Sequence, residues 1–273
     1  MIRHILFSEN EAFKLKAFME RARLYMPSAD FQLLIQAADD HALAYDQVIT
    51  ELAIPRRGRV NDQGVNIISN SSQFYGSVMA LLEESKDELV CFLTTDDMLF
   101  SHVDESIIES TFNDNDLFAF SLRLGKNITK NSMVKMANKV IPSFEGEHIM
   151  KWDWTKHYVD FSAPLSVHGH YFRNNHIRKM VRACKGVRSF SELEDALQKF
   201  MNFPKPMMAS FLESKAVSIN PIFDQSLETY VKDGLDRHIL NHGSISIITN
   251  YSLSLPEELH APLLEHEIRK AMS

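Results

Sequence analysis

Two adjacent carboxylates, Asp96 and Asp97, follow a continuous apolar run from Leu89 to Leu93. Such a run is typical of a strand that is buried on both faces, as in a parallel sheet. Ligands of open α/β sheets bind just beyond the carboxyl ends of the strands. Carboxylates at that position can hold a hard divalent cation, which in turn can neutralise a diphosphate. The pair therefore indicates a cation and phosphate site, although Asp is equally suited to begin a loop or to cap a helix.

A second group of chemical interest is His168-Gly169-His170. In a strand, alternation places residues 168 and 170 on one face, and imidazoles are good zinc ligands. A structural zinc site needs four ligands, however, and no Cys or further His with suitable spacing lies nearby in the sequence. The sequence therefore does not favour a zinc site here.

Alternating strands and helices are predicted to position these residues. The expected strands cover residues 2–7, 30–36, 65–68, 89–93, 117–124, 164–173 and 216–219, and the expected helices include 41–52, 103–112, 174–181 and one that opens at Ser191. Strand–helix alternation implies right-handed βαβ units and a parallel sheet. We expect an α/β fold with a mostly parallel central sheet flanked by helices. The carboxyl ends of its strands carry polar residues that would line one crevice.

Composition excludes several classes of protein. The 273 residues include 29 basic and 36 acidic side chains, a net charge of −7, which argues against a nucleic-acid partner. Only nine glycines occur, without a dinucleotide-binding, phosphate-loop or nucleophile-elbow motif. Two cysteines, no signal peptide and no apolar run long enough to cross a membrane together predict a cytoplasmic protein.

The order of these features resembles the glycosyltransferases of the GT-A fold, and in particular family 2-like members. Thr95-Asp96-Asp97 looks like a degenerate DxD motif in which Thr95 replaces the first carboxylate. The segment from Ser166 to Arg173 is similar to the acceptor-side segment of such enzymes, and Glu194-Asp195 looks like their Glu-Asp pair at a helix start. The resemblance covers residues 1–225 and implies transfer of a sugar from a nucleoside-diphosphate sugar to a hydroxyl acceptor.

The resemblance also assigns roles. Asp97 would hold Mn²⁺ or Mg²⁺, and Glu194 or Asp195 would be the general base of an inverting reaction. Ser191-x-x-Glu194 also matches a capping box, and if Glu194 caps the helix, Asp195 becomes the better base. Positions that would contact the UDP- or GDP-sugar are Ser8, Glu9, Asp39, Asn70, Thr95 and Asp96, and positions on the acceptor side, facing a glycan or another hydroxyl compound, are Asp160, His168 and His170.

Other interpretations stay open at this point. A nucleotidyltransferase shares an α/β sheet and an acidic metal site, but usually has a Gly-rich basic loop after the first strand, where this chain has Ser8-Glu9-Asn10. Thr95 also allows a non-catalytic glycosyltransferase-like binding domain. Residues 226–273 are expected to form a helical extension that packs on the sheet, makes a homodimer contact or touches a membrane surface peripherally. Its acidic side chains argue against anionic lipid.

Overall fold

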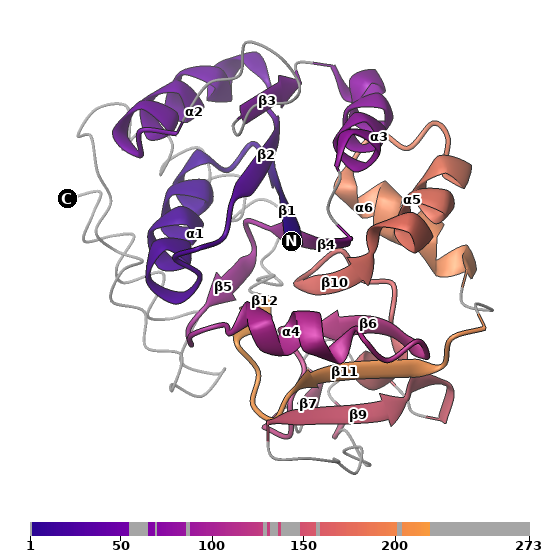
Figure 1. The fold of residues 1–273 in the computed structure, drawn as a ribbon. Helices are drawn as coiled ribbons and strands as arrows, with labels where there is room; N and C mark the ends of the chain where they lie inside the picture. The colour runs from indigo at the N-terminus through magenta and orange to yellow at the C-terminus, as the bar shows by residue number, and fades with distance from the viewer. Residues whose placement is uncertain are drawn as a thin grey trace.

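The computed structural model describes residues 2–54, 65–68, 70–85, 88–127, 130–131, 136–137, 148–156, 159–200 and 204–218 (Figure 1). The predicted helical extension at 226–273 lies outside these residues, as does much of the polar stretch from Gly125 to Lys139. Within the described ranges, no helix combines the length and the apolar character needed to span a bilayer.

The first half of the chain alternates strands and helices, as predicted. Its elements are β1 (Ile2–Glu9), α1 (Ala12–Tyr25), β2 (Phe31–Gln36), α2 (Asp39–Glu51), β3 (Val65–Ile68), the 3₁₀ turn η1 (Ser71–Gln73), α3 (Phe74–Glu84), β4 (Leu89–Thr94), β5 (Asp97–Leu99) and α4 (Glu105–Thr111). The second half is less regular. It contains β6 (Leu117–Ser121), β7 (Lys130–Asn131), β8 (Met136–Ala137), β9 (Ile149–Asp153), β10 (His170–Arg173), α5 (Asn174–Ala183), α6 (Phe190–Leu197), β11 (Met207–Phe211) and β12 (Ala216–Ser218), with the short 3₁₀ turns η2 (Trp154–Lys156), η3 (Val159–Ser162) and η4 (Gln198–Phe200).

The main sheet has eight strands in the order β3-β2-β1-β4-β10-β6-β11-β9. Strands β3, β2, β1 and β4 are parallel to one another, and β6 and β11 run in the same direction. Within this sheet, β10 and β9 run antiparallel to their neighbours. The predicted α/β fold with a mostly parallel central sheet is therefore confirmed.

Helices cover both faces of this sheet, and each face has its own hydrophobic core. One core joins strand residues such as Leu6 and Leu33 to α1, α2 and α4. The other joins Ile5 and Leu34 to α3, α5 and α6. Neighbouring strand residues enter opposite cores because side chains alternate across a strand. The continuous apolar runs of the sequence are thus explained by burial on both sides, and Figure 1 shows α1 and α2 on one side of the sheet and α3, α5 and α6 on the other.

Three parts of the sequence prediction are wrong in detail. Strands β9 and β11 are not among the expected strands, and β9 lies at the edge of the sheet. The strand expected over 164–173 is only four residues long, because residues 164–169 form turns before β10 begins at His170. Helix α5 contacts α3 and β10, and α6 contacts α5.

Candidate functional site

The antiparallel direction of β10 brings a distant segment to the carboxyl end of β4. His170 at the start of β10 pairs with Phe92 near the end of β4, so the preceding residues reach the same edge of the sheet. Two backbone hydrogen bonds fix this approach: Gly169 N–H donates to the Phe92 carbonyl at 2.8 Å, and Leu122 N–H donates to the Gly169 carbonyl at 2.8 Å. The segment 166–169 therefore lies beside Thr94 and the two aspartates.

Gly169 separates the two histidines of this segment. Its φ of +65° breaks the strand alternation, so His168 and His170 have different surroundings. His170 is buried, with Nδ1 3.3 Å from the Pro164 carbonyl, and burial holds the pKa of its imidazole well below the usual value. The expectation that both side chains share one face is wrong, and His170 is a core residue here.

Asp97 is the most deeply buried carboxylate of the site, with no exposed surface. It is the first residue of β5, and β5 pairs with β12 rather than continuing as a loop. The backbone N–H of Thr94 donates to Asp97 Oδ2 at 2.9 Å. The other carboxylate oxygen, Oδ1, lies 3.3 Å from His168 Nδ1. Asp97 therefore faces the imidazole and the end of β4, and not solvent.

His168 lies between two carboxylates. Its Nδ1 is 3.0 Å from Thr94 Oγ1 and 3.3 Å from Asp97, and its Nε2 is 3.6 Å from Glu194 Oε2. Burial by itself disfavours the charged imidazolium, but the attraction of Asp97, and to a smaller extent of Glu194, outweighs it. The pKa of His168 is therefore raised above its usual value. The arrangement is a continuous row of Asp97, His168 and Glu194 along the edge of the sheet.

Glu194 does not cap its helix. Helix α6 begins at Phe190, one residue before the predicted start at Ser191, and the hydroxyl of Ser189 accepts from Glu192 N–H at 3.2 Å. The alternative in which Ser191 and Glu194 form a capping box is therefore wrong, because the cap is Ser189, two residues earlier. Glu194 Oε1 instead accepts from Val167 N–H at 3.3 Å, and 27% of its side chain is exposed.

Asp195 is directed away from this row. It is exposed, and it lies about 100° further around α6 than Glu194 because an α-helix has 3.6 residues per turn. Of the two candidate bases, only Glu194 faces His168 and the carboxyl ends of the strands.

Asp96 is already paired with a cation of the chain. Its Oδ1 accepts from Lys14 Nζ at 2.6 Å, and the same ammonium lies 2.8 Å from Glu11 Oε1. The Asp96 side chain is 14% exposed, and that of Lys14 is 19% exposed. Burial would lower the pKa of Lys14, but the two carboxylates raise it above its usual value.

The two aspartates do not fit a metal ion as they are placed. Asp97 is enclosed and compensated by Thr94 and His168, and Asp96 is compensated by Lys14. In the part of the chain that the structure describes, no group of three or more His, Cys, Asp or Glu side chains is arranged to hold a metal. The position of Asp97 as a ligand for Mn²⁺ or Mg²⁺ stays a prediction that this geometry does not support.

The residues predicted to contact a nucleotide lie at the carboxyl ends of neighbouring strands, but several have structural partners. Ser8 is buried, and its Oγ lies 2.7 Å from the hydroxyl of Tyr45. Thr95 is also buried, and its N–H donates to the Phe7 carbonyl. The side chain of Asn70 accepts from Ser72 N–H and so caps η1.

Glu9 and Asp39 are more accessible than Ser8 and Thr95 at the same edge of the sheet. Glu9 is the last residue of β1 and is partly exposed, whereas Asp39 is exposed at the start of α2. On the acceptor side, Asp160 belongs to η3, and its side chain lies outside the described part of the structure.

Two contributors were not recognised from the sequence as part of this site. Lys14 could have been noticed only through its spacing of three residues from Glu11 on a helix, since its partner Asp96 is 82 residues away. The second is Arg123, whose Nε donates to the His168 carbonyl at 2.7 Å and whose Nη2 donates to Ser166 Oγ at 3.2 Å. Arg123 therefore holds the segment that carries His168.

Gly169→Ala is expected to lower the free energy of unfolding by about 1–2 kcal/mol, because φ is positive and a Cβ atom would lie 3.3 Å from Arg123 Cγ. Urea unfolding would measure the change. Gly76→Ala is the matched control, since a Cβ atom at Gly76 meets nothing within 4 Å and φ is helical. An equal or higher stability of Gly169→Ala would contradict the strain inferred at this turn.

No protein-family model and no curated protein sequence matches the chain. Among solved structures, S. aureus TarS is similar with 13% identity and a TM-score of 0.45, over 100% of this chain and 49% of TarS. S. aureus TarS 1–349 in complex with UDP has 12% identity and a TM-score of 0.42, over 99% of this chain and 81% of that one. A UDP-glucose pyrophosphorylase complexed with UDP-glucose has 12% identity and a TM-score of 0.43, over 88% of this chain and 99% of that one. The chain thus spans about half of the longer TarS structure.

Proposed function

We propose that this protein transfers a sugar from a nucleoside-diphosphate sugar to an acceptor hydroxyl, with Glu194 as the general base. The observation that carries the proposal is the row of Asp97, His168 and Glu194 at the carboxyl ends of β1 and β4. This edge of a parallel sheet is where α/β proteins bind their ligands. The resemblance of the motifs to family 2-like glycosyltransferases supports the same substrate class.

The row gives the three side chains different tasks. In the proposed reaction the acceptor oxygen forms a bond to the sugar carbon, the bond from that carbon to the diphosphate oxygen breaks, and the acceptor proton passes to Glu194 Oε2. Glu194 is the member of the row with the most exposed side chain, whereas Asp97 is enclosed. His168, as an imidazolium, holds Glu194 in place from one side and compensates Asp97 on the other. It is therefore a positioning residue.

A non-catalytic nucleotide-sugar binding domain is the second candidate. The pairing of Asp96 with Lys14 favours it, because this carboxylate is not free to recruit a metal for the departing diphosphate. A nucleotidyltransferase has less support, since β1 is followed by Asn10 and Glu11 and not by a Gly-rich basic sequence. Measurement of sugar-transfer turnover distinguishes a transferase from a domain that only binds the nucleotide-sugar.

Calorimetric titration with UDP and GDP is the first test. We expect one of the two to bind in the micromolar to millimolar range, with the corresponding sugar nucleotide binding at the same site. Release of the nucleoside diphosphate in the presence of a panel of glycan acceptors then measures transfer. A chain that binds neither nucleotide, with or without Mn²⁺, would remove both the transferase and the binding-domain proposals.

A further inference from the structure

Lys14 occupies an unusual position for a basic residue. It lies in the first turn of α1, where the partial positive charge of a helix N-terminus disfavours a cation. Its side chain is nevertheless folded back between Glu11 on its own helix and Asp96 at the end of β4. The cost of a cation at this end of the helix is compensated by two carboxylates, one of them from a distant part of the chain.

The ammonium lies between two carboxylates that would otherwise repel each other. The distances of 2.8 Å to Glu11 and 2.6 Å to Asp96 are those of charge-assisted hydrogen bonds. An ammonium carries three protons, and the two carboxylates accept two of them. The third can be donated to an oxygen atom of a ligand at this edge of the sheet.

We infer that Lys14 is a built-in cation that fills the position at Asp96 where a divalent metal would otherwise bind, so that nucleotide binding at this edge does not depend on added metal. The inference deepens the proposed function, on which its nucleotide part rests. It also accounts for a site whose two aspartates are both already compensated by groups of the chain, Asp96 by Lys14 and Asp97 by Thr94 and His168.

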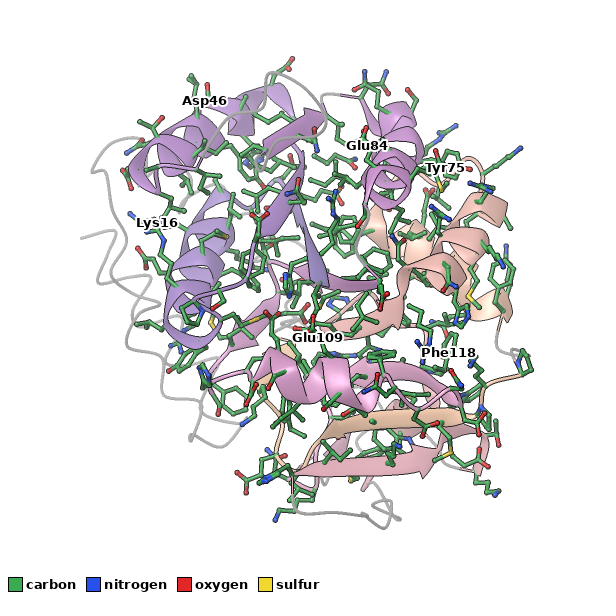
Figure 2. All side chains as sticks on the ribbon, in the orientation of Figure 1. Lys16, Asp46, Tyr75, Glu84, Glu109 and Phe118 are labelled. Atoms are coloured by element: carbon green, nitrogen blue, oxygen red, sulfur yellow. The ribbon has the colours of Figure 1, made fainter. Side chains whose placement is uncertain are left out.

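The other lysine of the same helix provides a matched control. The Nζ atom of Lys16 lies 2.7 Å from Glu51 Oε2. Glu51 is the last residue of α2, away from Asp96. Figure 2 labels Lys16 beside α1 on the side of the molecule occupied by α2. Lys16→Met removes the same charge from the same helix without changing the Asp96 pair.

Mn²⁺ binding without nucleotide, followed by electron paramagnetic resonance, tests the inference directly. We expect Lys14→Met to bind Mn²⁺ at least 10-fold more tightly than the wild type, because Glu11 and Asp96 are then left as hard oxygen ligands. Lys16→Met and Lys14→Arg should behave as the wild type. If Lys14→Met does not fold, Lys14→Gln gives the same measurement. A wild-type chain that binds Mn²⁺ as tightly as Lys14→Met or Lys14→Gln would overturn the inference.

Nucleotide binding provides the second readout. In the wild type, the affinity for UDP or GDP should change by less than about twofold between EDTA and Mn²⁺, whereas in Lys14→Met it should become Mn²⁺-dependent. Loss of wild-type binding in EDTA would contradict the inference while leaving the proposed function intact. Absence of nucleotide binding under every condition would contradict the proposed function, and the Mn²⁺ measurement would still decide the role of Lys14.

Discussion

Glu194→Gln is expected to lower the kcat of sugar transfer by roughly 100- to 10,000-fold, the usual contribution of a general base. Glutamine keeps the shape of the side chain and an oxygen that can accept from Val167 N–H, so the hydrogen bond at 3.3 Å can persist. What is lost is the carboxylate that would take the acceptor proton. The measurement is the initial rate of nucleoside-diphosphate release at saturating donor and acceptor, with melting curves to confirm that the variant folds.

Asp195→Asn is the matched control for this prediction. It removes a carboxylate from the neighbouring position of the same helix, but Asp195 is exposed and lies on another side of α6. We expect its kcat to stay within about twofold of the wild type, as for surface substitutions away from a site. The opposite pattern, in which Asp195→Asn is inactive and Glu194→Gln is active, would move the base to Asp195.

The double variant separates the base from the residue that positions it. If His168 acts through Glu194, His168→Gln alone lowers kcat with little change in KM for the donor. Combined with Glu194→Gln, it then adds little further loss, because residues that act as a unit are not additive. A loss of kcat in the double variant equal to the product of the two single losses would indicate that His168 acts independently of Glu194.

The parallel half of the sheet could be predicted because its signals are local. Continuous apolar runs such as Leu89 to Leu93 indicate strands buried on both faces, and the structure places neighbouring residues of these strands in opposite cores. The position of β10 could not be predicted in the same way. It inserts antiparallel between β4 and β6, which are separated from it by many residues, and its four-residue length carries little periodicity.

For the site, too, the candidate residues could be predicted from local sequence, but most of their partners could not. Asp96, Asp97, His168 and Glu194 were candidates from the sequence: the two aspartates follow a predicted strand, His168 lies within another, and Glu194 was named through the family resemblance. Several of their contacts join residues that are far apart in the sequence, such as Val167 and Glu194, which are 27 residues apart, and Lys14 and Asp96, which are 82 residues apart. The cap at Ser189 was missed because Ser189 and Ser191 both precede a Glu by three residues, and local sequence cannot choose between them.

Asp97→Ala is expected to lower the free energy of unfolding by about 3 kcal/mol near pH 6, because it leaves the Thr94 N–H without its acceptor and the partly buried imidazole of His168 without its counter-charge. Urea unfolding measures the change. Asp195→Ala is the control, and since Asp195 is exposed its stability should stay within about 0.5 kcal/mol of the wild type. A loss below 1 kcal/mol in Asp97→Ala would mean that the row of three side chains does not stabilise the fold.

The pH dependence of this loss follows from the raised pKa of His168. A histidine with a higher pKa in the folded state contributes stability that is fully present below its unfolded pKa of about 6.5 and is lost as the pH rises through the folded value. Asp97 supplies the largest attraction that raises this pKa, so Asp97→Ala removes the contribution. The stability difference between the wild type and Asp97→Ala should therefore be larger at pH 6 than at pH 9. A difference that grows with pH would place the neutral imidazole, and not the imidazolium, beside Asp97.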